Sequence, residues 1–252
     1  MNQQHPIVYR GDRNRFAALV ARYMRAEPMT LIALVIPAAV LFAFVTLGNA
    51  IGRGSTRAFD EAIILAMRTP GNLADPVGPL WFQEMVRDFT ALGSTGVLTL
   101  VVLAIAGFLI MTNKGYAALF VLLAVGGGVL ISESMKWAYA RPRPDLVPHG
   151  AEVYSASFPS GHSMMSAVVY LTLGALLART QSNRAVKSYV LTLAIAVTLL
   201  VGTSRVYLGV HWPTDVLAGW SLGGAWALLC WFVMTWLQSQ GQVEPESSST
   251  AT

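Results

Sequence analysis

The residues best suited to chemistry lie in three short polar segments of an otherwise apolar chain: KWAYARPRP at 136–144, PSGH at 159–162 and SRVYLGVHWPTD at 204–215. These segments include the cations Lys136, Arg143 and Arg205, and their only acidic residue is Asp215. Arginine offers a planar fork of donors that suits phosphate, and lysine offers a compact point charge. Three such cations facing one point would bind a phosphate-like anion. For each cation taken alone, the alternative is a side chain that reaches toward lipid headgroups.

The PSGH segment directly precedes a long apolar run that predicts a helix. A small polar residue and a glycine at a helix start leave backbone N–H groups and the positive end of the helix dipole available to an anion. Ser160 adds a hydroxyl donor. An ordinary N-cap is the alternative, and it accounts for Ser160 and Gly161 but not for His162.

The third segment places His211 four residues before Asp215. Pro213 is predicted to be the first residue of the last helix, where its missing N–H costs nothing. Asp215 then lies in the first turn and can accept a hydrogen bond from one imidazole nitrogen of His211. The other nitrogen is thereby kept unprotonated, as a nucleophile or base requires. The alternative for Asp215 alone is a plain cap of the helix dipole.

Together these residues predict phosphoryl transfer through a histidine. His211 would attack phosphorus to form a phosphohistidine, His162 would donate a proton to the leaving oxygen, and water would then cleave the intermediate. The phosphate oxygens would be held by a set of donors, namely Lys136, Arg143, Arg205, Ser160 and Gly161. No Asp/Glu cluster indicates a divalent metal, so we expect neither a metal nor another cofactor.

The composition predicts a membrane protein around this site. The chain has 252 residues, of which 54% are hydrophobic and 12% are charged, whereas a soluble domain carries about 25% charged residues. A soluble fold of this size could not bury so much apolar surface. The net charge of +4 comes from scattered basic residues rather than a basic run, so nucleic-acid binding is not expected. The single cysteine, Cys230, excludes an intrachain disulfide framework.

Six apolar stretches are long enough to cross a bilayer as helices, at 29–48, 95–111, 116–135, 163–180, 187–204 and 215–237. We therefore predict an all-α polytopic membrane protein with six transmembrane helices in a bundle. The polar segments follow the third helix, begin the fourth and join the fifth to the sixth. By parity all three lie on one face of the membrane, which indicates a single site formed by loops on that face.

The same pattern predicts the chain's organisation. We expect a cytoplasmic N-terminal segment at 1–28, a membrane domain at 29–237 and a disordered tail at 238–252. The polar lead before the first apolar stretch favours an uncleaved span over a signal peptide. Lys and Arg number nine on the side of the termini and eight on the other, where several serve the site. This balance favours termini in the cytoplasm and a site facing the periplasm or exterior of the cell inner membrane.

One long connection, 49–94, contains an amphipathic stretch whose apolar residues recur at helical spacing: Trp81, Phe82, Met85, Val86 and Phe89. This stripe fits a helix lying at the membrane interface, and it fits packing against the bundle equally well. The sequence leaves both readings open.

The three segments together resemble the signature of the type-2 phosphatidic-acid phosphatase family, within the vanadium-haloperoxidase-like superfamily. The matching positions are Lys136–x6–Arg143-Pro144, Pro159-Ser160-Gly161-His162 and Ser204-Arg205–x5–His211–x3–Asp215. The resemblance implies a metal-independent lipid phosphatase with its site at the outer face. By analogy Lys136, Arg143, Ser160, Gly161 and Arg205 bind phosphate, His162 is the general acid, His211 is the nucleophile and Asp215 orients it.

The resemblance implies a membrane lipid phosphate as substrate, and we rank undecaprenyl diphosphate first because bacteria must recycle that carrier. The alternatives are phosphatidylglycerophosphate or phosphatidic acid as substrate, a phosphotransferase that passes the phosphoryl group to a lipid, and, last, a non-enzymatic anion transporter. The oligomeric state is left open.

Further residues near the signature also have predicted roles. Arg141 and His149 are candidates for contact with a second phosphate. Glu133 either pairs with Lys136 or is solvated at the interface. The stretch RDFTALGS at 87–94 is also typical of bacterial members, and it offers Thr90 or Ser94 as a helix cap.

Overall fold

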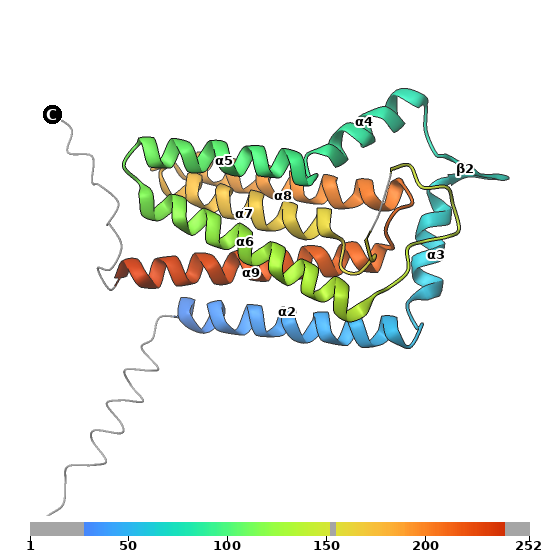
Figure 1. Cartoon of the computed structure of the whole chain (residues 1–252), viewed down its shortest axis with the longest axis horizontal. Coiled ribbons are helices and arrows are strands. Elements are labelled where there is room, and N and C mark those ends of the chain that lie inside the picture. Colours follow the sequence, from blue (N-terminus) through green and yellow to red (C-terminus); the bar gives the residue numbers. More distant parts are fainter. Residues whose placement is uncertain (1–27, 152–154, 240–252) are drawn as a thin grey trace, which may run out of the picture.

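The computed structural model describes residues 28–151 and 155–239 (Figure 1). Residues 1–27 and 240–252 lie outside the described residues. The predicted cytoplasmic N-terminal segment and disordered tail fall almost wholly there and remain predictions.

All six predicted spans are helices. They are α2 (Pro28–Gly52), α5 (Thr95–Met111), α6 (Gly115–Tyr139), α7 (Gly161–Arg179), α8 (Arg184–Tyr207) and α9 (Pro213–Ser239). Five of them are long and apolar enough to cross a membrane alone. The sixth, α5, qualifies together with α4 (Leu80–Ala91), from which it is bent by 48°. The expected all-α polytopic fold is confirmed.

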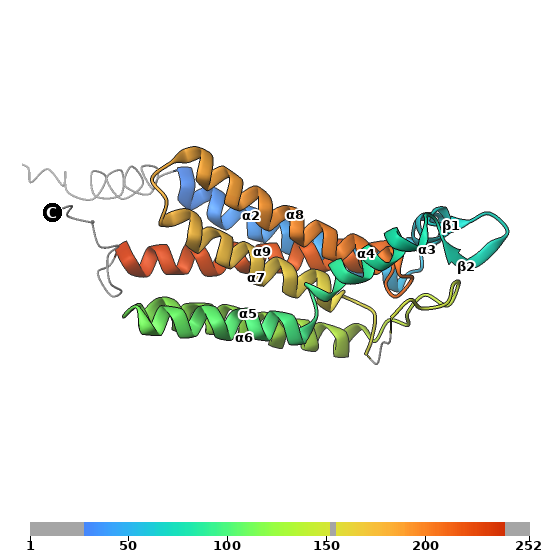
Figure 2. The same ribbon diagram turned by 90° about the horizontal axis from the view of Figure 1, so that it is seen from above.

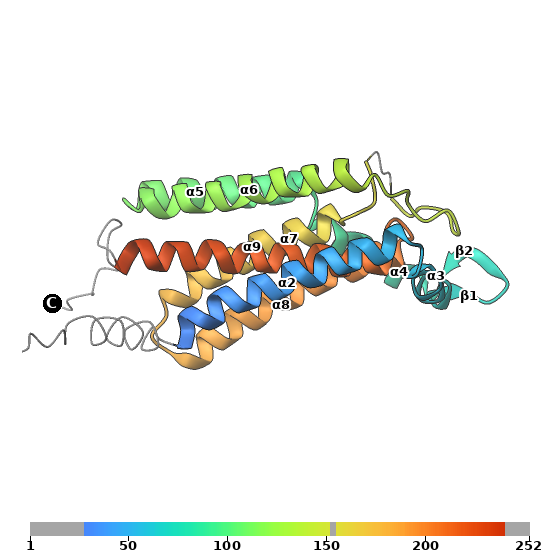
Figure 3. The same ribbon diagram turned by 90° about the horizontal axis from the view of Figure 1, so that it is seen from below.

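The helices form a bundle whose long axes run roughly in one direction (Figures 1, 2 and 3). The hairpin of α5 and α6 makes one layer, and α7 and α9 lie between it and the pair of α2 and α8 (Figure 3). Leu98, Val121 and Val169 pack between α5, α6 and α7. Large apolar side chains such as Phe108 and Leu130 are exposed on the outer faces, as expected for helices surrounded by lipid.

The connection after α2 forms a small outer structure at one end of the bundle (Figure 1). It contains α3 (Arg57–Ala66), the antiparallel strands β1 (Arg68–Thr69) and β2 (Asn72–Pro76), and α4. Phe82 and Val86 of α4 pack against the end of α8, with Tyr207 and Leu208. Of the two readings of this amphipathic stretch, packing against the bundle therefore holds for Phe82 and Val86, whereas Trp81 is exposed.

Two left-handed residues mark the ends of helices near the bundle's two faces. Asn113, with φ of 59°, lies in the tight turn between α5 and α6. Ala140, with φ of 43°, ends α6, and an irregular segment then leads to α7. Because α6 ends there, Arg141 and Arg143 lie outside the helix and across the ends of its neighbours.

Candidate active site

The three polar segments meet at one end of the bundle, where α6 and α8 end and α7 and α9 begin (Figure 1). A cavity of about 740 Å³ lies there. Six of the eight predicted site residues line it: Lys136, Arg143, Gly161, His162, Arg205 and His211. The convergence predicted by parity is therefore present. Asp215 and Ser160 are fully buried and do not line the cavity.

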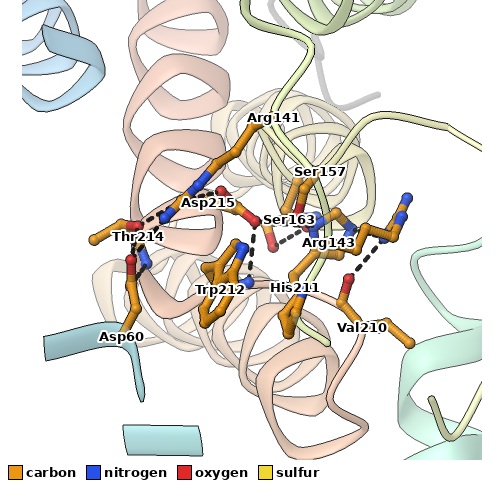
Figure 4. A network of polar contacts seen from close by, with 12 residues as sticks. Asp60, Arg141, Arg143, Ser157, Ser163, Val210, His211, Trp212, Thr214 and Asp215 are labelled. Atoms are coloured by element: carbon orange, nitrogen blue, oxygen red, sulfur yellow. Dashed lines mark hydrogen bonds and ion pairs between the residues drawn. The ribbon is translucent and has the colours of Figure 1, made fainter. Parts of the chain in front are cut away.

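His211 contacts a different partner through each ring nitrogen (Figure 4). Its Nε2 lies 3.1 Å from Nη1 of Arg143. Because arginine can only donate, Nε2 must accept, and the proton of the neutral ring lies on Nδ1. Nδ1 is 3.5 Å from Oδ2 of Asp215 and 3.3 Å from Oγ of Ser157. Burial lowers the pKa of His211 from 6.5 to about 4, so the imidazole is neutral near pH 7 with Nε2 unprotonated.

The Asp215 carboxylate makes contacts of both kinds that the sequence left open. It caps the start of α9, because Oδ2 accepts the backbone N–H of Trp212 at 3.0 Å. The same oxygen faces Nδ1 of His211, and Oδ1 accepts from Nη1 of Arg141 at 2.5 Å. A fully buried carboxylate must be compensated by such donors, so its orientation toward His211 is closely constrained.

Ser157 is a site residue that the sequence analysis missed. It is fully buried in the segment between α6 and α7, and its hydroxyl donates to Oδ2 of Asp215 while lying within reach of His211. Its own backbone N–H donates to the carbonyl of Arg141 at 2.9 Å. No spacing rule marks a loop serine of this kind, so nothing in the sequence pattern identifies it.

Two of the three cations keep their charge available for a ligand. Arg143 donates to the carbonyls of Ser155 and Val210, and Arg205 donates to Oγ1 of Thr90 at 3.1 Å. Within the described residues neither has a carboxylate partner. Burial lowers the pKa of Arg143, which reflects the cost of holding a cation with neutral partners only. An anion in the cavity would relieve that cost.

The third cation, Lys136, has a carboxylate partner. Its Nζ lies 2.8 Å from Oε1 of Glu133, so of the two roles predicted for Glu133 the pair is the observed one. The Glu133 side chain is 63% exposed and also lines the cavity. The cavity therefore contains one carboxylate beside its cations.

The start of α7 supplies backbone donors, as predicted, but Ser160 does not face the cavity. Its Oγ accepts from the N–H of Ser163 at 3.5 Å and from the Ser163 hydroxyl at 3.0 Å. It is thus the N-cap of α7, and its own N–H donates to the carbonyl of Asp215. Gly161 does face the cavity, and a Cβ there would lie 3.2 Å from Nζ of Lys136. The absence of a side chain at Gly161 lets the lysine approach the helix start.

Two buried donors beside the cavity have no hydrogen-bond partner in the part of the chain that is described. They are Nε of Arg205 and the hydroxyl of Ser132. Both residues line the cavity, and Ser132 is 2% exposed. Both atoms are therefore free to bind a ligand. Leaving a buried donor unpaired costs about 1–3 kcal/mol, and a ligand that accepts from it would remove that cost.

The stretch 87–94 borders this site. Thr90 accepts from Arg205, and Ser94 caps α5 by accepting from the N–H of Val97 at 3.3 Å. At Gly93 a Cβ would lie only 2.3 Å from Val201, so any side chain would displace the junction of α4 and α5. Of the two predicted caps, Ser94 caps α5 and Thr90 positions a cation.

Arg141 and His149, the candidates for a second phosphate, do not line this cavity. Arg141 is bound to Asp60, Thr214 and Asp215. Nε2 of His149 lies 2.7 Å from the carbonyl of Pro144. The expectation that they contact a second phosphate is therefore not supported by their positions.

The cavity also has an apolar arm between α5, α6 and α7, lined by Leu98, Val102, Leu122, Val125 and Val129. Leu122 lies fourteen residues before Lys136 on the same helix, or about 21 Å along its axis at 1.5 Å per residue. A ligand that fills this space would need an anionic head and an extended apolar tail. Among the described residues no group of three His, Cys, Asp or Glu side chains is arranged to hold a metal ion.

A helical membrane bundle with such a cavity is typical of a protein that binds an anionic lipid. Comparison with known proteins identifies the family. Residues 117–239 match the PAP2 superfamily. Phosphatidylglycerophosphatase B of Bacillus subtilis is 35% identical over 191 residues, which are 74% of this chain and 89% of that protein. An undecaprenyl-diphosphatase of Sulfolobus acidocaldarius is 38% identical over 88 residues, or 36% of its length.

A solved structure agrees. The crystal structure of a transmembrane PAP2-type phosphatidylglycerolphosphate phosphatase from Bacillus subtilis is similar with a TM-score of 0.71 and 33% identity. The match covers 81% of this chain and 96% of that one. The chain belongs to the PAP2 superfamily, and it is a membrane lipid phosphatase of that family.

Proposed function

We propose that the protein hydrolyses a membrane lipid phosphate in two steps through a phosphohistidine at His211. The observation that carries this proposal is the pair of contacts made by His211, which lines the cavity with the cations: Nε2 lies against Arg143 and Nδ1 faces Asp215. These contacts leave Nε2 unprotonated. A neutral imidazole oriented by a buried carboxylate is a competent nucleophile toward phosphorus.

In the first step Nε2 of His211 forms a bond to phosphorus, and the bond to the lipid oxygen breaks. His162 donates the proton that this oxygen needs. In the second step water attacks phosphorus, the P–N bond breaks, and inorganic phosphate leaves while His162 takes up the water's proton. His162 suits this role because it lines the cavity and makes no side-chain hydrogen bond within the described residues.

Charge stabilisation is assigned to Lys136, Arg143, Arg205 and the N–H of Gly161, all of which border the cavity. We add Ser132 to this set, because its unpaired hydroxyl lies near Lys136 and Gly161. The position that a Cβ on Gly161 would occupy is 3.2 Å from Nζ of Lys136 and 3.9 Å from Oγ of Ser132. Preorganised donors of this kind favour the transition state, where the charge on the phosphoryl oxygens must be stabilised. Ser160 acts through the geometry of the helix start rather than by contact.

For the substrate we propose a lipid phosphomonoester, with phosphatidylglycerophosphate first. Two observations support this order over undecaprenyl diphosphate, the substrate ranked first on sequence alone. The relative with the matching name covers most of both chains, whereas the undecaprenyl-diphosphatase match is confined to 88 residues. In addition, the Glu133 carboxylate beside Lys136 would repel the second phosphate of a diphosphate.

Transfer of the phosphoryl group to a lipid acceptor instead of water remains the main alternative. Labelled donor lipid distinguishes the two, because hydrolysis puts the label in free phosphate and transfer puts it in a second lipid. A passive anion transporter would need charges along several helices at mid-depth. The site's cations instead gather at one end of the bundle.

We further propose that this end faces the periplasm or exterior, with both termini in the cytoplasm. Support comes from the Lys and Arg balance, since Lys136, Arg143 and Arg205 are accounted for by the site. A C-terminal fusion to a reporter that folds only in the cytoplasm should be active. An inactive reporter on a functional enzyme would contradict this orientation.

The function is tested by phosphate release from a panel of glycerolipid and isoprenoid phosphates in detergent with EDTA present. The purified protein should release phosphate, fastest from phosphatidylglycerophosphate, and His211→Ala should release none. Full activity in that variant would overturn the assignment of the nucleophile. Loss of wild-type activity in EDTA that added metal restores would overturn the metal-independent mechanism.

A further inference from the structure

Asp60 is a fully buried carboxylate that the two-step mechanism does not use. It lies on α3, the outer helix that precedes the β-hairpin, and its side chain is 0% exposed. It accepts the backbone N–H of Thr214 at 2.9 Å and the Thr214 hydroxyl at 2.8 Å. Thr214 is the neighbour of Asp215 at the start of α9. Asp60 therefore fixes the helix turn that carries the catalytic carboxylate.

Arg141 connects the two carboxylates (Figure 4). Its Nη2 lies 2.8 Å from Oδ2 of Asp60, and its Nη1 lies 2.5 Å from Oδ1 of Asp215. The ring of Trp212 lies against the same guanidinium, 5.4 Å from Cζ. Arg141 thus pairs with a carboxylate of the outer helix α3 and with a carboxylate of the site. Because Asp60 partly neutralises the guanidinium, less of the positive charge of Arg141 acts on Asp215.

We propose that Asp60 is a positioning residue of the active site, acting through Arg141 and Thr214 on Asp215 and so on His211. This inference rests on the proposed function of His211. Asp60, Arg141 and Asp215 together carry one net negative charge, because two carboxylates share one guanidinium. That charge favours the positive imidazole ring that develops as His211 attacks. Without Asp60, Arg141 would neutralise Asp215 completely.

The charge argument predicts opposite effects for the two halves of one ion pair. Asp60→Asn leaves the group neutral, whereas Arg141→Gln leaves it with two negative charges. The other ionisable groups that act on His211 are Arg143 from the loop before α7, His162 from α7 and Arg205 from α8. These are the same in all variants. A shift between variants therefore reports the Asp60–Arg141 pair.

The test measures kcat, KM and the acidic limb of kcat/KM for phosphate release by the full chain. Asp60→Asn should lower kcat about tenfold, the factor that corresponds to one pKa unit at His211, with KM little changed. Arg141→Gln should move the acidic limb to higher pH. The double variant Asp60→Asn/Arg141→Gln restores one net negative charge, so its limb should return toward the wild-type position. Glu61→Gln is the matched control, because Glu61 follows Asp60 on α3 and pairs with Arg57 at the surface.

The outcomes separate this proposal from the proposed function. The positioning role is wrong if Asp60→Asn has the same kcat as Glu61→Gln. It is also wrong if the acidic limb of the double variant lies at the same pH as that of Arg141→Gln, or higher. If wild type releases phosphate and His211→Ala does so equally, the proposed function fails instead. Should Asp60→Asn not fold, Thr214→Val takes its place, because it removes the hydroxyl that donates to Asp60. A kcat for Thr214→Val equal to that of Glu61→Gln contradicts the proposal.

Discussion

The Nδ1 atom of His211 lies 3.5 Å from Oδ2 of Asp215, and the hydroxyl of Ser157 contacts both residues. The carboxylate and the hydroxyl together hold the imidazole with its proton on Nδ1. Nε2 then faces Arg143 at the cavity. The proposed nucleophile of this PAP2 protein, His211, is thus in contact with two buried groups. Only one of them, Asp215, belongs to the signature.

Ser157→Ala should lower kcat about tenfold or more. The serine donates to an ionised carboxylate, and such a hydrogen bond contributes about 1.5–3 kcal/mol. KM should change little, because Ser157 does not line the cavity. Steady-state kinetics on phosphatidylglycerophosphate give both values. A kcat equal to that of the wild type would show that Asp215 orients His211 without the hydroxyl.

Ser132→Ala should weaken phosphate binding, whereas Ser134→Ala should not. Both serines lie on α6, but Ser134 donates to the carbonyl of Leu130 at 2.7 Å and faces outward. Helical serines commonly form this bond to the carbonyl four residues earlier, and Ser132 does not. Inhibition by inorganic phosphate measures the effect. We expect severalfold weaker inhibition for Ser132→Ala, and equal inhibition in both variants would contradict the assignment.

Glu133→Gln should raise activity on undecaprenyl diphosphate relative to phosphatidylglycerophosphate, by severalfold. The substitution removes the carboxylate beside Lys136 and with it the repulsion of a second phosphate. The ratio of the two kcat/KM values is the measurement, with Glu61→Gln as the control for a surface carboxylate remote from the cavity. An unchanged ratio would mean that Glu133 does not discriminate.

Acid should destabilise the protein partly through His211. Burial lowers its folded-state pKa from 6.5 to about 4, so as the pH falls the unfolded chain takes up the proton first. The free energy of unfolding therefore falls between about pH 6.5 and pH 4, by an amount on the order of 3 kcal/mol. Thermal unfolding in detergent at pH 7 and pH 4.5 should show a smaller loss for His211→Gln than for wild type. Parallel losses would contradict a buried neutral histidine.

The helices and the convergence of the site could be predicted from sequence, because apolar length and parity determine them. Lys136, Gly161 and His211 meet because α6 ends, α7 begins and the connection from α8 to α9 lies at the same end of the bundle. The predicted start of the last helix at Pro213 is also confirmed. The fixed spacing of residues within each segment is what identifies them in the sequence.

The residues that support the site could not be predicted in this way. Asp60 lies 154 positions before Thr214, on an outer helix whose packing no periodicity specifies. Ser157 lies in an irregular segment, and its direction depends on the whole path between α6 and α7. Ser160 has the type and spacing of a phosphate ligand, but its hydroxyl faces Ser163. Side-chain direction at a helix start depends on which group the cap accepts from.

The central claim is a covalent phosphohistidine at His211, and rapid acid-free quenching with lipid labelled in its phosphate tests it most directly. Wild-type protein should carry label that is stable in alkali and released in acid, and mass spectrometry should locate it on His211. His211→Ala should carry none. Phosphate release by wild type without any labelled protein, or label that persists in His211→Ala, would contradict the account.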